Sequence, residues 1–467
     1  MILQPDTFER DIPMRTLFNP FRAVVPALLL LFAAGIAAAQ DFAVPGAIPP
    51  SPISDPAEVT LVGDWRIEVV YRGKSEIFDV DPPETVTVTD EKYDRLDKFN
   101  PAGPPWHRAT PLQALKADEC SVENALVPGT TVVTLRPGGE ALEADKDYIL
   151  DEPGANIGWK EGGKIGPETT VYISYKYVPM RIDSIVCVDN RMRLVPGAVH
   201  AVNPVPPELE EGEIRLANIY VCHETKDRLT DDNLYPILDD GTLRIPREAV
   251  AKKLLPKTWK KLHDGEPLKI LAWGDSVTVG RYAAEEEKWQ NVFLKRLRER
   301  FPGANIELVT QAWGGRTTAT YLAEPSGSEY NYREKVLDLK PDLIISEFVN
   351  DFALPREQLE VIYPRLKTDF DAIGAEWIIV GPHYIRPNWM GLTSQKNCDD
   401  DPRPYTAFIR SFGGENDVPV AETPILYGRL WRQGIPYNTL MVNNINHPNA
   451  YGLSLFADAL MALFGTE

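Results

Sequence analysis

The chain has 467 residues and a formal net charge of −19, with 43% hydrophobic and 25% charged residues. This composition is typical of a soluble globular protein, and the length is too great for one ordinary domain, so we expect two. We predict neither nucleic acid nor an anionic membrane as a partner, because both require basic patches on the protein surface.

The N-terminal segment has the pattern of a targeting sequence. Arg15 and Arg22 precede an apolar stretch over residues 24–36, and the alanines at 37–39 offer a small-residue cleavage site. This pattern predicts a secretory signal peptide over residues 1–39, a secreted or periplasmic protein, and no membrane association after cleavage. An uncleaved membrane anchor is the alternative, but the apolar stretch is short for a membrane span.

The next part of the chain is predicted to be β-rich. Apolar and polar residues alternate over residues 65–71 and 171–177, and a further β-like run covers residues 182–188. Glycines and prolines separate these runs, as in folds built from many short strands. The pattern predicts a β-sandwich domain over residues 56–235.

The pattern changes again toward the C-terminus. Residues 236–266 are expected to connect the two domains, with a helix over residues 250–262. Beyond them, strands alternate with amphipathic helices. The expected strands are Leu268–Ala272, Leu343–Phe348 and Trp377–Val380, and the expected helices lie around residues 289–297, 359–370 and 453–463. This alternation predicts an α/β, flavodoxin-like domain over residues 267–467, with a parallel sheet covered on both faces.

Ser276 follows the first of these strands in the run Trp273-Gly274-Asp275-Ser276-Val277-Thr278. Gly274 permits a tight turn that would lift Ser276 to the carboxyl edge of the sheet, where open α/β sheets place their sites. An exposed serine with a base beside it is a candidate nucleophile. Taken alone, a serine at this place is more often a turn former or a helix cap.

Three further polar blocks follow along the chain. The four blocks lie at residues 273–278, 313–318, 347–351 and 444–449. In this order they resemble those of the SGNH (GDSL-type) hydrolase family, and the resemblance covers roughly residues 266–465. It implies that Ser276 is the nucleophile, Gly315 a backbone donor, Asn350 a side-chain donor and His447 the base, with Gly314 as the alternative backbone donor.

The chemistry of these groups agrees with the roles that the resemblance implies. The backbone N–H groups of Ser276 and Gly315 and the side-chain amide of Asn350 could converge on the oxygen of a tetrahedral intermediate. We therefore expect these three residues to form an oxyanion hole.

Two positions depart from the family pattern. Phe348 stands where a glycine is usual, and Asn444 stands where an aspartate three residues before the histidine is usual. The amide oxygen of Asn444 could accept a hydrogen bond from Nδ1–H of His447, but it brings no negative charge. We expect a Ser276–His447 dyad, with His447 oriented by Asn444, by a backbone carbonyl or by an acid from elsewhere in the chain.

The resemblance also implies a substrate class, since secreted relatives that combine this domain with a β-sandwich are often polysaccharide deacetylases. We expect an acylated carbohydrate as the substrate. The residues proposed to contact it, by stacking or hydrogen bonding, are Trp313, His383, Tyr384, Arg386 and Trp389. The alternatives are a lipase or lysophospholipase, and a non-catalytic glycan-binding protein whose catalytic site has decayed.

Cysteine and histidine usage bears on disulfides and metals. Cys120, Cys187, Cys222 and Cys398 permit two disulfides in an oxidising compartment, with three possible connectivities. The chain has six histidines, no Cys-x-x-Cys pair and no His-Glu-x-x-His, so we predict no metal and no other cofactor. The sequence leaves open the polysaccharide, the acyl group, the oligomeric state and the role of the β domain.

Overall fold

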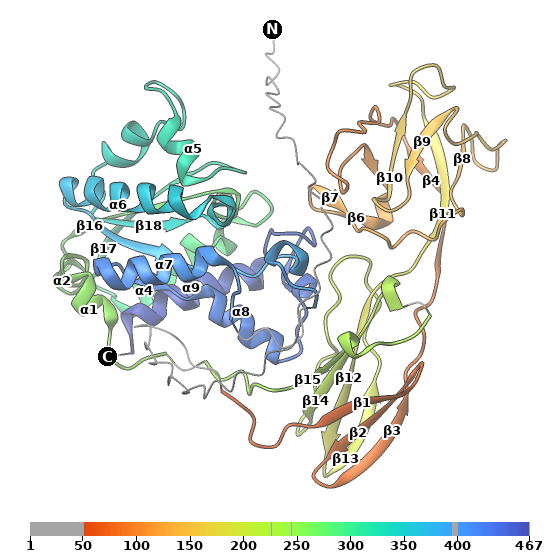
Figure 1. Ribbon diagram of the computed structural model, residues 1–467, viewed down its shortest axis with the longest axis horizontal. Helices are drawn as coiled ribbons and strands as arrows, with labels where there is room; N and C mark the ends of the chain where they lie inside the picture. Colours follow the sequence, from red (N-terminus) through yellow and green to blue (C-terminus); the bar gives the residue numbers. More distant parts are fainter. Residues whose placement is uncertain (1–50, 226, 244, 395–399, 467) are drawn as a thin grey trace, which may run out of the picture. The chain divides into compact units, whose positions relative to one another are not determined.

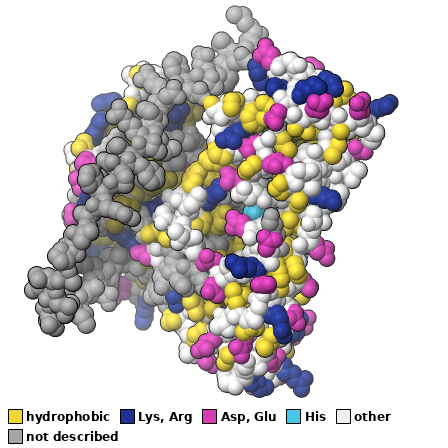
Figure 2. Space-filling model, turned by 45° about the vertical axis from the view of Figure 1, so that its right-hand side comes forward, with side chains coloured by type: hydrophobic (Ala, Val, Ile, Leu, Met, Phe, Trp, Pro, Cys, Tyr) yellow, Lys and Arg dark blue, Asp and Glu magenta, His cyan; other side chains and the backbone are white. Residues whose placement is uncertain are grey.

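The computed structural model describes residues 51–225, 227–243, 245–394 and 400–466. The predicted signal peptide over residues 1–39 and Cys398 lie outside the described residues. Within those ranges, no helix has the length and apolar character needed to cross a membrane. On the face shown in Figure 2, Lys and Arg side chains stand among Asp, Glu and hydrophobic side chains. The absence of a nucleic-acid partner stays a prediction.

The N-terminal part of the described chain consists of short antiparallel strands (Figure 1). The strands are β1 (Glu58–Gly63), β2 (Arg66–Tyr71), β3 (Lys74–Asp79), β4 (Val86–Tyr93), β5 (Thr110–Pro111), β6 (Lys116–Ala117), β7 (Cys120–Ser121), β8 (Val132–Thr134), β9 (Tyr148–Asp151), β10 (Asn156–Trp159), β11 (Val171–Tyr177), β12 (Arg181–Val188), β13 (Arg191–Val195), β14 (Ile214–Val221) and β15 (Leu234–Pro236). The β-rich region that the alternating residues predict is therefore present.

This β region contains two hydrophobic clusters, where the sequence suggested a single sandwich. Sheets β1-β2-β3 and β13-β12-β14-β15 share one cluster, which includes Ile67, Ile185 and Ile219. Strands β4 to β11 surround the other cluster, which includes Ile157 and Ile173. Alternation of apolar residues identifies strands, but it does not say which strands pair. The division depends on β12, which pairs with β13 and β14 and leaves β11 to pair with β4 and β8.

The C-terminal part is the predicted parallel α/β sheet. Its strands are β16 (Pro267–Gly274), β17 (Asn305–Ala312), β18 (Leu343–Glu347), β19 (Glu376–Val380) and β20 (Val420–Ala421). Their order is β17-β16-β18-β19-β20, and every pairing is parallel. All carboxyl ends consequently meet at one edge of the sheet, which is where the predicted site residues begin.

Helices cover both faces of this sheet (Figure 1). The α-helices are α1 (Val250–Leu254), α2 (Pro256–Asp264), α3 (Ser276–Val279), α4 (Trp289–Arg300), α5 (Thr318–Ala323), α6 (Arg356–Ile373), α7 (Pro404–Asn416), α8 (Thr423–Arg432) and α9 (Ala450–Phe464). Helices α1, α2, α4, α8 and α9 pack in one cluster, and α5, α6 and α7 pack in the other. The single helix expected over residues 250–262 is two, because Pro256 begins a new helix at its first position.

Strand β16 shows why the sheet is buried on both sides. Leu268, Ile270 and Ala272 belong to the cluster on one face, while Leu271 and Trp273 belong to the cluster on the other. A strand that is covered on both faces requires an apolar run without alternation, which is what residues 268–273 provide apart from Lys269.

The described cysteines do not form disulfides. Cys120, Cys187 and Cys222 are free and buried. Among the described residues no disulfide is therefore formed, and these three side chains serve as small apolar groups in the two β clusters.

Candidate active site

The turn that carries Ser276 is fixed by a close approach of backbone. Strand β16 ends at Gly274, and Ser276 is the first residue of α3. A Cβ atom on Gly274 would lie 2.7 Å from Cβ of Thr278 and closer still to the Thr278 hydroxyl and the carbonyl oxygen of Glu347. Only glycine fits at this point, and the chain can then turn sharply from strand to helix with Ser276 at the sheet edge.

The structure brings Ser276 and His447 together. The distance between Ser276 Oγ and His447 Nε2 is 3.1 Å, which is within hydrogen-bond range. His447 lies on the loop that leads into α9 and is only 8% exposed, while Ser276 is half-buried. The ring of Tyr282 stacks on the imidazole at a centroid distance of 4.7 Å and an angle of 14°. The imidazole is thus held in place beside a hydroxyl that remains reachable.

Two side chains that the sequence analysis did not assign to this role shape residues 442–449, the loop that carries His447 and is called the histidine loop below. Oδ1 of Asn443 accepts hydrogen bonds from the backbone N–H groups of Ile445, Asn446 and His447, at 3.0, 3.0 and 2.9 Å. Nε2 of His383 lies 2.7 Å from the carbonyl oxygen of Asn446. An asparagine whose side chain binds backbone N–H groups just ahead of it is a common turn device, so the Asn-Asn pair was the available signal.

The predicted oxyanion donors lie around the serine turn. A Cβ on Gly314 would be 3.7 Å from Cβ of Ser276, so this glycine packs against Ser276. Gly315 has a φ of +70° and open space at its Cβ position. The side-chain nitrogen of Asn350 lies 3.4 Å from the carbonyl oxygen of Arg316, which joins the third block to the second. Three of the four sequence blocks therefore meet at one place.

Asp275 connects the turn that carries Ser276 to the turn that carries Asn350. One carboxylate oxygen accepts a hydrogen bond from the backbone N–H of Val277, and the other accepts one from that of Asn350, both at 3.0 Å. Burial raises the pKa of Asp275 to about 7, and it also raises the pKa of the neighbouring Glu347 well above its usual range. The buried acid thus fixes the spacing between the turn at Ser276 and the turn at Asn350.

Phe348 accounts for one of the two departures from the family pattern. Its ring centroid lies 4.7 Å from that of Trp273 and 5.8 Å from that of Tyr321, and its side chain is buried. The aromatic ring fills the core beneath the sheet edge, so glycine is not required there and the backbone of Asn350 still reaches Asp275.

Asn444 does not orient His447. Among the described residues, neither polar atom of its side-chain amide has a hydrogen-bond partner, and both atoms are buried. Its φ is +55°, a left-handed conformation that asparagine tolerates better than most residues. The expectation that Asn444 holds the imidazole is therefore wrong. The left-handed backbone conformation at this position explains why an asparagine is found there.

The second nitrogen of the imidazole, Nδ1, faces the carboxylate of Glu119 from the β region. Nδ1 of His447 lies 3.5 Å from Oε2 of Glu119, a residue between β6 and β7. The pKa of His447 is lowered to about 4, chiefly by burial; the charge of Glu119 opposes this shift and that of Arg281 adds to it. The ring is therefore neutral at ordinary pH and able to accept a proton at Nε2.

Of the predicted substrate residues, two are in the core. His383 and Tyr384 are fully buried, and both pack against Tyr427. Burial lowers the pKa of His383 to about 3. Because both are buried, neither side chain is placed to contact a substrate. The sequence pattern of β19 indicates where the strand ends, but it does not indicate which way the following side chains point.

The remaining three predicted residues lie nearer the surface but already have partners. Trp313 is stacked on Tyr330 at 4.1 Å and 3°, and the guanidinium of Arg316 lies 4.4 Å from its ring centroid. Arg386 pairs with Glu123 of the β region at 2.7 Å. The ring of Trp389 lies 5.3 Å from that of Trp106. Their role in substrate binding stays a prediction.

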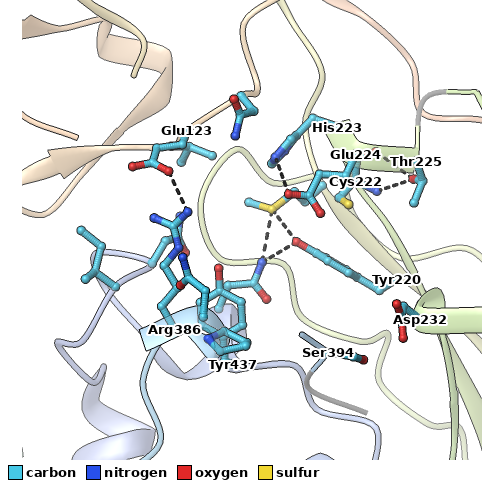
Figure 3. A pocket seen from close by; sticks show the side chains of 18 of the residues that line it. Glu123, Tyr220, Cys222, His223, Glu224, Thr225, Asp232, Arg386, Ser394 and Tyr437 are labelled. Atoms are coloured by element: carbon cyan, nitrogen blue, oxygen red, sulfur yellow. Dashed lines mark hydrogen bonds and ion pairs between the residues drawn. The ribbon is translucent and has the colours of Figure 1, made fainter. Parts of the chain in front are cut away.

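A cavity of about 530 Å³ with both polar and apolar lining residues lies beside the histidine loop. Its lining includes Asn443, Asn444 and Ile445 from that loop, together with residues of the β region. Figure 3 shows the ion pair of Glu123 and Arg386 on one side of the cavity and Tyr220 and His223 on the other. Neither Ser276 nor His447 is part of the lining.

One group of described side chains could reach a common cation. One ligand atom from each of Asp118, Glu119 and His447 lies within 4.8 Å of the others. Acidic side chains at a surface turn are common without an ion, and we assign no metal to them. The absence of a metal stays a prediction.

Comparison with known proteins supports the family assignment. Residues 272–454 match the model of the GDSL-like Lipase/Acylhydrolase family. Comparison with curated proteins gives no match. Among solved structures, a two-domain esterase active on acetylated mannans is 17% identical with a TM-score of 0.37, covering 46% of this chain and 54% of that one. The chain thus spans about half the length of that esterase.

An acetylxylan esterase from Geobacillus stearothermophilus is 19% identical with a TM-score of 0.34, covering 44% of this chain and 97% of that one. The fold of residues 267–466, the order of the four sequence blocks and the family match agree with one another. Residues 272–454 of this chain therefore form a domain of the GDSL-like lipase/acylhydrolase family.

Proposed function

We propose that the protein is a serine esterase that removes short acyl groups, most simply acetyl, from a polysaccharide or oligosaccharide. The observation that supports this proposal most strongly is the 3.1 Å contact between Ser276 Oγ and His447 Nε2 at the carboxyl edge of a parallel sheet. The family match supports ester hydrolysis in general. Secretion through residues 1–39 remains part of the same proposal.

The proposed reaction begins with attack by Ser276 Oγ on the acyl carbon, while its proton moves to Nε2 of His447. The carbonyl oxygen becomes negatively charged and is stabilised by N–H groups of Ser276, Gly315 and Asn350. Return of the proton from Nε2 releases the sugar hydroxyl and leaves an acyl-serine. A water molecule that gives its proton to His447 then hydrolyses this intermediate and restores the serine.

The cavity beside the histidine loop favours a carbohydrate over a long-chain lipid. Its lining combines the charged side chains of Glu123 and Arg386 with the aromatic side chain of Trp106 and the side-chain amide of Asn388. Carbohydrates bind through hydrogen bonds and aromatic stacking, whereas a fatty acyl chain requires a continuous apolar groove. The volume of about 530 Å³ is within the usual range for ligand pockets.

The test is ester hydrolysis by the purified full chain. Acetate release is measured from acetylated xylan, pectin and algal polysaccharides, and fatty acid release from long-chain lipid esters. We expect acetate release from at least one polysaccharide, reduced by at least ~10³-fold in Ser276→Ala. Ser411→Ala is the matched control, because the side chain of this exposed serine on α7 donates its hydrogen bond to Glu415, one turn along the same helix.

The outcomes separate the proposal from its alternatives. Full activity of Ser276→Ala would overturn the assignment of the nucleophile. Release of fatty acids without acetate would instead indicate a lipase or lysophospholipase. Binding of a polysaccharide without hydrolysis of any ester would indicate a glycan-binding protein whose catalytic site has decayed.

A further inference from the structure

The Nδ1 atom of His447 needs a partner that its own loop does not provide. Within the described residues it has no hydrogen bond, and the amide of Asn444 does not reach it. When Nε2 accepts a proton from Ser276, the ring becomes a buried cation. A buried cation without a compensating group is costly, so the chemistry of this site calls for an acceptor at Nδ1.

The turn between β6 and β7 is docked onto the histidine loop on both sides of Glu119. The backbone N–H of Asp118 donates to the carbonyl oxygen of Val442 at 3.2 Å. The thiol of Cys120 donates to the carbonyl oxygen of Asn443 at 2.9 Å. Glu119 lies between these two anchors, so its backbone is held next to His447 although it belongs to the β region.

The two oxygens of the Glu119 carboxylate have different neighbours. Oε1 pairs with the guanidinium of Arg281, which follows the nucleophile helix, and Oε2 faces Nδ1 of His447 at 3.5 Å. The ion pair with Arg281 therefore turns the second oxygen toward the imidazole. The Nδ1 distance is long for a hydrogen bond, and catalytic hydrogen bonds commonly shorten when substrate binds.

The backbone conformation of Glu119 is a second observation that points to its side chain. Ala117 pairs with Cys120, so Asp118 and Glu119 form a two-residue turn, and the φ of Glu119 is +57°. Glycine and asparagine are favoured at such a position, and a glutamate there is disfavoured. Backbone strain beside a candidate site motivates the question of what the side chain does there, and the Glu119 side chain faces His447.

We propose that Glu119 is the positioning residue for His447, so that the β region completes a Ser–His–Glu arrangement that the hydrolase domain lacks by itself. This inference rests on the proposed esterase function. In the reaction, the serine proton moves to Nε2 while the proton on Nδ1 stays on the ring and is shared with Oε2. The Glu119 side chain thereby fixes the tautomer and stabilises the imidazolium.

The test compares variants of the full chain. Glu119→Gln removes the charge at constant size, and Glu119→Gly removes the side chain and also relieves the left-handed backbone. We expect kcat to fall by ~10²-fold in both, less than the ~10⁴-fold of a buried triad Asp→Asn change because Glu119 is partly exposed. We expect the melting temperature of Glu119→Gly to be equal to or higher than that of the wild type, which a purely structural role would not give.

Glu285→Gln is the matched control. Glu285 pairs with Lys288 on the segment after Arg281 and has no contact with His447, so we expect its kcat to stay within about twofold of the wild type. Glu119→Asp keeps the charge and is expected to recover part of the activity.

The pH profile of kcat/KM gives a readout that stability alone would not move. The charged and titratable groups near His447 are Glu119, Asp118, Arg281, Tyr282 and His383. Removing the negative charge in Glu119→Gln should move the acid limb to lower pH, and Arg281→Gln should move it to higher pH. Opposite shifts follow only if both charges act on the imidazole.

Two results would overturn this inference. One is a kcat of Glu119→Gln within threefold of the wild type and an unchanged acid limb, while Ser276→Ala is inactive. In that case the proposed esterase function stands and the proposed role of Glu119 fails. The other is loss of wild-type activity on addition of EDTA and its recovery with Zn²⁺, because Asp118, Glu119 and His447 would then serve a cation.

Discussion

Gly274→Ala tests the claim that a close backbone approach shapes the serine turn. The added Cβ would lie 2.7 Å from Cβ of Thr278, and closer to the Thr278 hydroxyl and the Glu347 carbonyl oxygen. Carbon atoms in contact are normally about 3.5–4.0 Å apart, so the overlap is roughly 0.8 Å or more. The carbonyl belongs to β18, the parallel neighbour of β16, and can move only if the two strands separate.

The expected effects follow from that overlap. Overpacking of a core typically costs about 1–3 kcal/mol, and we expect the upper end of this range because strand backbone is involved. For a domain of this size each kcal/mol lowers the melting temperature by about 2–4 °C, so the loss is about 6–12 °C. A displacement of Ser276 by about 1 Å should also lower kcat/KM by ~10²-fold.

The assay is thermal unfolding together with hydrolysis of an acetyl ester. Gly303→Ala is the matched control, because Gly303 is exposed and has open space around its Cβ position. We expect that control to change the melting temperature by no more than about 2 °C, corresponding to about 0.5 kcal/mol. A Gly274→Ala variant with wild-type stability and wild-type kcat/KM would refute the reasoning about this turn.

Three further predictions concern the site. Asn444→Asp should give no gain in kcat and should lower the melting temperature, because the new carboxylate would be buried without a partner. A gain in kcat of tenfold or more in steady-state assays would show that residue 444 does reach the imidazole. The acid limb of the pH profile of kcat/KM, measured with a soluble acetyl ester, should lie near pH 4, since burial lowers the pKa of His447 to about 4 and the base works only when neutral. An acid limb near pH 6.5 would contradict this prediction. Asn350→Ala should lower kcat by about 10²–10³-fold with little change in KM, as expected for a group that binds the oxyanion only in the transition state, and an unchanged kcat would remove it from the oxyanion hole.

The sequence was sufficient to predict the α/β sheet and the edge at which its site residues lie. Continuous apolar runs such as residues 268–273 require burial on both faces, and that requirement determines a parallel sheet with helices on both sides. Once the strands are parallel, the positions after β16, β17 and β18 are necessarily close together. The proximity of Ser276, Gly314 and Asn350 is therefore a consequence of strand order.

The partner of Nδ1 could be foreseen only as an open possibility. The sequence suggested an acid from elsewhere, but Glu119 lies on a hairpin of the β region, and no local pattern connects that hairpin to His447. Its contact depends on the β6–β7 hairpin docking onto the loop of His447 through Val442 and Asn443. Docking of this kind depends on surface shape, which a pattern of apolar residues does not encode.

Side-chain direction was the other limit. Tyr384 follows β19, at the correct edge, yet it points into the core beside Tyr427 and Trp431. The same strand-end rule that placed Ser276 correctly gave no information about where the side chains of the loop after β19 would turn. The structure also separates the β region into two clusters, because strand pairing is set by long-range contacts.

The central claim is that Ser276 is a nucleophile activated by His447. The most direct measurement is labelling of the full chain with a fluorophosphonate probe, followed by mass spectrometry of its peptides. We predict an adduct on the peptide that contains Ser276, strongly reduced in His447→Gln and absent in Ser276→Ala. Labelling of Ser276 that is undiminished in His447→Gln, or no labelling of Ser276 in the folded wild type, would contradict the claim.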